Sequence, residues 1–258
     1  MFTGPIFRRE ALTAPRSARH FLMRSGSVLA LFVLMYTAEK AILGFGSASG
    51  PAASARFGAL LFQIFALVEL TLAMFFGLLF AAGTVSQEKD RGTLLLLLMT
   101  DLRNRELVFG KLGAGLLSIG VVLVTAIPAF CLLPLLGGVM VGQILAALAL
   151  CAAAGVAAGS WGTLVAYWRE KTFQTLAIGV VGAIGWITAV ELVVALVGAS
   201  TPAGRIVGLF DPYRAIMPIL NPFADSRGET VFWSVPALLG LAAVINGITL
   251  WMFLPWDC

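Results

Sequence analysis

Long apolar stretches, separated by short polar segments, define the layout of this chain. Each of the five longest is long enough for the roughly 20 apolar residues with which an α-helix crosses a bilayer. They cover Phe57–Val85, Leu107–Gly137, Gln143–Trp168, Thr172–Val197 and Val231–Leu254. With a shorter sixth stretch near the N-terminus, the pattern predicts an all-α, polytopic membrane protein with about six transmembrane helices. Residues 1–258 are expected to form a single transmembrane domain.

The first apolar stretch, Ser25–Ala38, is interrupted by the charged pair Glu39-Lys40. Arg24 and Lys40 can extend their charged ends toward water, which lengthens the span to about Phe21–Leu43. The alternative is a cleaved signal peptide, because the small residues Ser47–Ser49 offer a cleavage site. The long charged leader that precedes this stretch favours a membrane span.

Composition supports the same class of protein. Hydrophobic residues make up 60% of the chain and charged residues 12%, and the mean hydropathy is +0.97. A soluble domain of this size would carry about twice that charge. The formal net charge of +4 comes from residues that flank apolar stretches, so it indicates orientation in a lipid bilayer and no affinity for nucleic acid.

The distribution of Lys and Arg predicts the orientation. Of the 17 Lys and Arg residues, 12 lie in the N-terminal segment 1–24, the connection 86–111 and the hairpin 169–171. The remaining five are Lys40, Arg56, Arg205, Arg214 and Arg227. Because positive charge concentrates in cytoplasmic loops, both termini and the 86–106 segment are expected in the cytoplasm of a multi-pass cell (inner) membrane protein.

The connection between the predicted spans Phe57–Val85 and Leu107–Gly137 is the most polar part of the chain. Nine charged residues fall between Glu88 and Lys111. A short helix fits Gln87–Met99, with a charged first turn followed by the apolar run Leu94–Leu98, and Thr100 or Asp101 could cap the next helix. Such a helix would lie flat on the cytoplasmic face of the membrane, where it could contact a soluble partner.

This segment resembles the signature of ABC-2-type transporter permeases. The resemblance rests on Glu88, Gly92-Thr93, the leucine run, Arg105-Glu106-Leu107 and Gly110-Lys111, about 30 residues in all, with Asp101 where the family commonly has proline. It implies the membrane subunit of an ATP-driven exporter that forms a homodimer, or a heterodimer with a related permease. A separate ABC ATP-binding subunit, which holds ATP and Mg, would dock on a coupling helix. The coupling residues would be Gln87, Glu88, Lys89, Asp90, Arg91, Gly92 and Thr93.

The resemblance also bears on what we expect of two other segments. Residues 1–24 alternate arginines with apolar residues, which fits a cytoplasmic, interfacial elbow helix or else a solvated basic tail. Residues 199–230 form the long extracytoplasmic connection. Within it, Gly208–Leu220 fits a re-entrant pair of short helices better than an exposed loop, because its apolar side chains would be costly to leave in water.

No motif for catalysis is present. The chain has no G-x-x-x-x-G-K-[ST] phosphate-binding loop, no H-E-x-x-H and no G-x-S-x-G, and His20 is its single histidine. Cys131, Cys151 and Cys258 read as small apolar residues with no paired spacing. We therefore expect no catalytic residue, no metal site and no enzymatic activity by this chain alone.

Two acidic residues, Glu69 and Glu191, lie within predicted spans. Carboxylates inside a membrane are candidates for a substrate path or a proton relay. The alternative is that each is neutral or hydrogen-bonded to a neighbouring helix. If the two carboxylates couple ions to transport, the chain would be an ion- or proton-coupled secondary transporter; a non-transporting membrane scaffold is a third reading.

Small residues mark two helix faces. Gly155 and Gly159 form a small-x-x-x-small pair, which lets another helix approach closely, either within the chain or in a dimer. Gly179, Gly182 and Gly185 lie on one side of the next predicted span.

Overall fold

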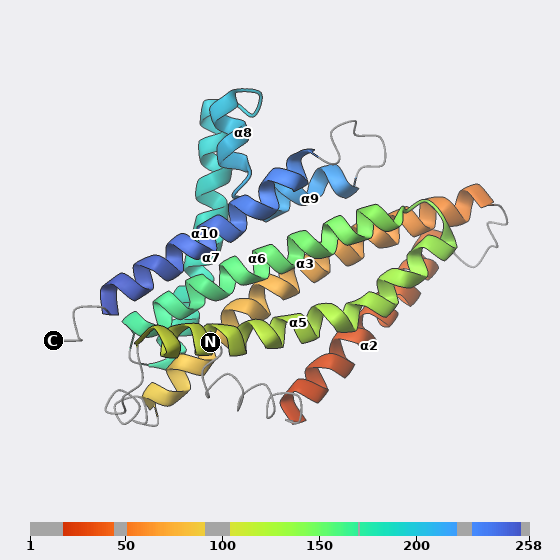
Figure 1. The fold of residues 1–258 in the computed structure, drawn as a ribbon. Helices are drawn as coiled ribbons and strands as arrows, with labels where there is room; N and C mark the ends of the chain where they lie inside the picture. The colour runs from red at the N-terminus through yellow and green to blue at the C-terminus, as the bar shows by residue number, and fades with distance from the viewer. Residues whose placement is uncertain (1–17, 44–50, 91–103, 170, 221–228, 254–258) are drawn as a thin grey trace.

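The computed structural model describes residues 18–43, 51–90, 104–169, 171–220 and 229–253, and every regular element within these ranges is an α-helix (Figure 1). The helices are α2 (Ala18–Leu43), α3 (Pro51–Asp90), α5 (Asn104–Leu136), α6 (Val141–Trp168), α7 (Thr172–Val197), α8 (Pro202–Gly208), α9 (Pro212–Leu220) and α10 (Glu229–Phe253).

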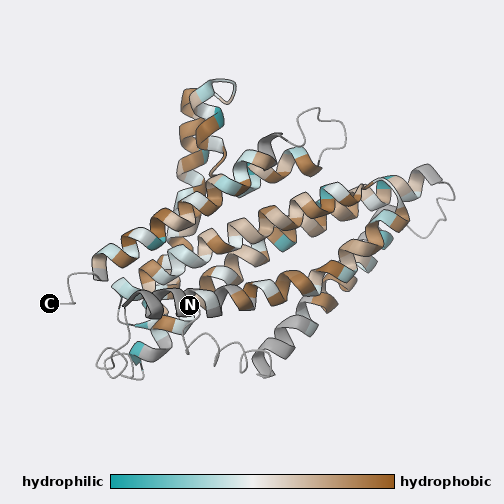
Figure 2. Ribbon diagram, viewed as in Figure 1, coloured by the Kyte–Doolittle hydropathy of each residue, from teal (hydrophilic) through white to brown (hydrophobic). Residues whose placement is uncertain are grey.

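Five of these helices are long and apolar enough to cross a membrane: α3, α5, α6, α7 and α10. In the coloured parts of these helices, Figure 2 shows brown, apolar residues distributed along the helix axes. The expectation of an all-helical, polytopic membrane protein is confirmed at this level. The expected first span corresponds to α2, whose apolar part, Val28–Thr37, is shorter. The expected elbow falls mostly on residues 1–17, outside the described residues.

The end of α3 differs from the sequence-based expectation. This helix has 40 residues and runs without a break to Asp90, so the separate helix expected to begin at Gln87 is wrong in its first turn. At 1.5 Å per residue, α3 is about 60 Å long, twice the ~30 Å hydrocarbon thickness. Its apolar part, Ala53–Ser86, covers 34 of these 40 residues, so the apolar stretch itself is longer than one bilayer crossing. The rest of the expected coupling helix, residues 91–103, lies outside the described residues.

Helices α3 and α6 form the most extensive pair in the structure. Small residues permit the close approach: a Cβ atom on Gly77 would lie 2.6 Å from the carbonyl oxygen of Gly155, and one on Gly162 would lie 2.7 Å from that of Leu78. Gly159 also faces the Gly77 carbonyl. The small-x-x-x-small pair of α6 is thus used for packing within the chain, as one of the two sequence-based readings expected.

Helix α5 packs against α3 and also contacts α6. The Phe130 ring makes edge-to-face contacts with Phe62 and Phe65 of α3, with centroids 6.3 and 6.2 Å apart. After α5 the chain turns through Gly137 and Gly138, both with positive φ. A Cβ atom on Gly138 would lie 2.1 Å from the Ala55 carbonyl oxygen, so this turn depends on glycine to pack against the start of α3.

Helix α7 leans away from the α3–α6 pair, as Figure 1 shows. Near its start, Thr175 and Gly179 are buried, whereas Val190 and Val194 are the buried residues of its second half, where α8 packs against it. Only 11% of its apolar stretch is buried inside the protein, compared with 50% for α6. Most of the α7 surface therefore faces outward.

The connection after α7 contains two short helices, α8 and α9. The pair of helices expected within Gly208–Leu220 is wrong in part, because only α9 lies in that segment and α8 ends where it begins. Helix α9 packs against α3, α6 and α10. Its residues Ala215, Ile216, Ile219 and Leu220 are buried. The alternative of an ordinary exposed loop is therefore wrong for this part of the connection.

Candidate functional site

The end of α3 carries four of the seven residues expected to contact an ATP-binding subunit. Two of them, Lys89 and Asp90, have described side chains, and both contact the α6–α7 hairpin. The side chains of Gln87 and Glu88, and all of residues 91–93, lie outside the described part. The contacts of Lys89 and Asp90 therefore define what the structure shows of this predicted coupling segment.

Lys89 binds the C-terminal end of α6. Its Nζ donates hydrogen bonds to the carbonyl oxygens of Ala166, Tyr167 and Arg169, at 2.8, 2.6 and 3.0 Å. The last carbonyl oxygens of a helix have no partner within the helix and carry partial negative charge, so an ammonium group both satisfies and neutralises them. This arrangement fixes the end of α3 to the end of α6.

Asp90 binds the beginning of α7. Thr172, the first residue of α7, donates a hydrogen bond from its hydroxyl to the Asp90 carboxylate. A negative charge near a helix N-terminus is favourable because the first N–H groups there carry partial positive charge. Through two adjacent side chains, the end of α3 is thus joined to both helices of the hairpin. Lys89 and Asp90 are therefore integral to the bundle.

The two membrane carboxylates have different surroundings. Glu69 is only 1% exposed, and its Oε1 has no hydrogen-bond partner among the described residues. It lies in the α3–α6 core, close to the Cys151 thiol. Glu191 of α7 instead accepts hydrogen bonds from Arg214 Nη1 at 3.2 Å to both carboxylate oxygens. Within the described ranges, no hydrogen bond or ion pair joins the two carboxylates.

A further acidic residue, Asp211, lies near Glu191. Its Oδ1 accepts hydrogen bonds from the backbone N–H groups of Tyr213 and Arg214, at 2.8 and 3.4 Å, and so caps α9. The residue is 1% exposed, and its Oδ2 has no partner in the described part of the chain. Burial raises the pKa of Asp211, the two N–H groups lower it, and Glu191 raises it further. This grouping could not be recognised in the sequence, because its members are distant along the chain.

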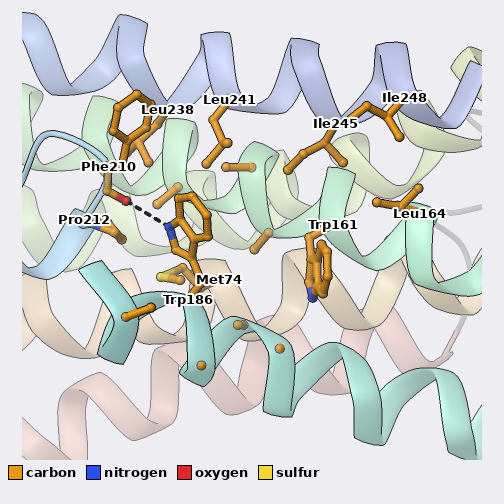
Figure 3. Close-up of a pocket in the computed structure, with 17 residues that line it drawn as sticks. Met74, Trp161, Leu164, Trp186, Phe210, Pro212, Leu238, Leu241, Ile245 and Ile248 are labelled. Carbon is orange, nitrogen blue, oxygen red and sulfur yellow. Dashed lines mark hydrogen bonds between the residues drawn. The ribbon is translucent and has the colours of Figure 1, made fainter. Parts of the chain in front are cut away.

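An apolar cavity of about 440 Å³ opens between α6, α7 and α10 (Figure 3). Leu238, Leu241, Ile245 and Ile248 of α10 line one side, and Trp161 and Leu164 of α6 line another, with Trp186 of α7 facing them. The Trp186 Nε1 donates to the Phe210 carbonyl at 3.4 Å, and the Trp161 Nε1 donates to Gly179 at 3.1 Å. Both indole donors are therefore used within the protein.

Small residues of α7 make room for this cavity. Gly182 and Gly185 line it, and nothing lies within 4 Å of a Cβ atom placed on Gly185. The row of glycines on one side of this predicted span was visible in the sequence. The sequence alone did not indicate that these glycines line a cavity. Neither Glu69 nor Glu191 lines the cavity.

Comparison with known proteins does not place the chain in a family. It matches no family model, and a search of curated proteins finds no significant relative.

Proposed function

We propose that this chain is the transmembrane permease subunit of an ATP-driven transporter of the ABC-2 type, acting as an exporter. The proposal rests on the resemblance of Glu88, Gly92-Thr93 and the Arg105–Lys111 region to that family's signature. The apolar helices support a membrane location. In this proposal α2 crosses the membrane in addition to the five longer helices, which makes six spans in all. Helices α8 and α9 are re-entrant, residues 1–17 contain the elbow, and two permeases form a dimer.

The observation that favours coupling most is the junction formed by Lys89 and Asp90. Lys89 fixes the end of α3 to the end of α6, and Asp90 contacts the start of α7. A force applied to the 87–93 segment would therefore act on three helices together. A partner subunit that changes shape on binding and hydrolysing ATP could in this way shift the helices that surround the membrane path.

The energy source would lie in the partner. The sequence contains no phosphate-binding loop of the G-x-x-x-x-G-K-[ST] type, so ATP and Mg would be held by a separate ATP-binding subunit. This chain would supply the docking segment and the path for substrate. The end of the bundle that carries Lys89 would face the cytoplasm, in agreement with the excess of Lys and Arg there.

Purification of the tagged chain from its native membrane, under mild detergent conditions, tests the proposal. We expect an ATP-binding subunit to copurify in stoichiometric amount, with vanadate-sensitive ATP hydrolysis. Charge reversal of both Glu88 and Arg91 should abolish this association. The matched control is charge reversal of Arg56, at the opposite end of α3, which should leave it intact.

A preparation free of ATPase that still transports substrate in liposomes would contradict the proposal. It would favour the second candidate, an ion- or proton-coupled transporter. The observation in its favour is that the buried Oε1 of Glu69 has no hydrogen-bond partner within the described part of the chain. That candidate predicts that Glu69→Gln abolishes transport, whereas the ATP-driven mechanism predicts that ATP hydrolysis by the complex persists in this variant.

A further inference from the structure

A second cavity, of about 370 Å³, adjoins the apolar one. Its lining includes Arg205 of α8, Arg214 of α9 and Ser234 of α10, and among the described residues no carboxylate lines it. Each guanidinium group has five N–H donors. Arg214 Nη1 contacts Glu191 and Arg205 Nη2 donates to the Ser200 carbonyl, so further donors of both groups are available to a ligand.

The two cavities meet at the segment between α8 and α9. Leu209 lines the cavity with the arginines, and its neighbour Phe210 lines the apolar one. On α10 the same change occurs between Ser234 and Leu238, which are separated by about 6 Å along the helix. A cavity lined in part by two arginines and a cavity with apolar walls therefore lie next to each other.

The apolar cavity has the length of half a bilayer. It follows α10 from Leu238 to Ile248 and α6 from Ala154 to Leu164, about 15 Å along each helix. The hydrocarbon core of a membrane is about 30 Å thick, so one leaflet accounts for half of this. Because both indole N–H groups are bonded within the protein, these walls suit a hydrocarbon chain better than a polar molecule.

We propose that this pair of cavities binds a membrane phospholipid with an anionic headgroup. One acyl chain occupies the cavity between α6, α7 and α10, and the phosphate lies between Arg205 and Arg214. Arginine binds phosphate oxygens with paired N–H donors, which gives the headgroup a defined position. Glu191 and Asp211 do not line the arginine cavity. The site is distinct from the proposed coupling segment and does not require an ATP-binding subunit.

The test uses the purified chain alone in a neutral detergent, titrated with phosphatidylglycerol that carries brominated acyl chains. Bromine quenches tryptophan fluorescence on contact, and Trp161 and Trp186 line the cavity. Gly185→Leu fills the apolar cavity from a position with open space around it. Its matched control is Gly240→Leu on α10, which also has open space but does not line the cavity.

We expect saturable quenching in the unmodified chain and in Gly240→Leu, and at least about tenfold weaker binding in Gly185→Leu. Ala189→Leu, a second cavity-filling variant, gives the same test if the first does not fold. Equal quenching in the control and in both cavity-filling variants would overturn the acyl-chain site.

The headgroup is tested with Arg205→Gln. Loss of one charged hydrogen-bonding group should weaken binding of brominated phosphatidylglycerol about tenfold. Binding of brominated phosphatidylcholine should change less, and inorganic phosphate at millimolar concentration should not displace the lipid. Equal affinity for both lipids, unchanged in Arg205→Gln, would overturn the anionic headgroup site, and displacement by phosphate alone would overturn a lipid ligand.

Discussion

Replacement of Lys89 by methionine tests the junction at the end of α3. Methionine retains an unbranched apolar side chain but has no ammonium group. The carbonyl oxygens of Ala166, Tyr167 and Arg169 then lose the donor that holds them at 2.6–3.0 Å. We expect the variant to insert in the membrane and to unfold more easily than the unmodified chain.

The magnitude follows from the surroundings of Lys89. A hydrogen bond from a charged group contributes about 1.5–3 kcal/mol, and a cation at a partly buried helix C-terminus up to about 2 kcal/mol. Lys89 is only partly buried, so water can reach the freed carbonyl oxygens and offset part of the loss. We therefore expect a loss of about 2 kcal/mol, or roughly 30-fold in the equilibrium constant for unfolding.

Thermal unfolding of the purified chain in detergent, followed by tryptophan fluorescence, measures this loss. Lys171→Met is the matched control, because Lys171 is exposed and its side chain makes no capping hydrogen bond to α7. Lys89→Arg should recover part of the stability, since guanidinium also donates to carbonyl oxygens. Equal midpoints for Lys89→Met and Lys171→Met would refute the assigned role of Lys89.

Three further predictions concern packing and titration. Gly77→Ala places a Cβ atom 2.6 Å from a backbone oxygen of α6, so we expect a loss of about 1–3 kcal/mol in thermal unfolding, whereas Gly240→Ala, in open space, should cause none. Asn246 Nδ2 donates a hydrogen bond to Ser160 Oγ at 2.9 Å. Replacing both residues by alanine should therefore lower the free energy of unfolding by less than the sum of the two single replacements. The expected difference, which is the coupling energy of the pair, is about 0.6 kcal/mol and up to about 1.7 kcal/mol. Burial raises the pKa of the Asp211 carboxyl group, so the native chain binds the carboxyl proton more tightly than the unfolded chain does. The free energy of unfolding should therefore fall as the pH rises from 3.8, the ordinary pKa of this group, toward the raised pKa. Asp211→Asn keeps an oxygen to cap α9 and should lose this dependence, as denaturation at a series of pH values would show; an unchanged profile would contradict the assignment.

The positions of the spans could be predicted from the sequence because lipid solvation requires a minimum length of apolar helix. The expected stretch Thr172–Val197 coincides with α7, and Gln143–Trp168 differs from α6 only at its start. The end of α3 could not be predicted in the same way. Hydropathy marks where a helix leaves the apolar region, but α3 continues to Asp90 because Lys89 and Asp90 find partners on α6 and α7.

The cavity and the pairing of Glu191 with Arg214 could not be predicted either. In a soluble helix the apolar face indicates the direction of the core, but a membrane helix is apolar on its lipid-facing side as well. The sequence of α7 therefore does not reveal which side faces α10. Glycines such as Gly182 and Gly185 indicate a close approach or an open space, and only the arrangement of the helices distinguishes these two outcomes.

The lean of α7 gives the molecule a long lever arm. Helix α7 is packed at Thr175 and Gly179, close to its junction with Asp90, while Val197 lies 18 residues beyond Gly179, or about 27 Å along the axis. A rotation of roughly 10° about Gly179 displaces the far end by about 5 Å, close to the width of one hydrocarbon chain. The gap between α7 and α10 therefore depends on the angle at this anchor, together with the contacts that Trp186 and Glu191 make with Phe210 and Arg214 farther along the helix.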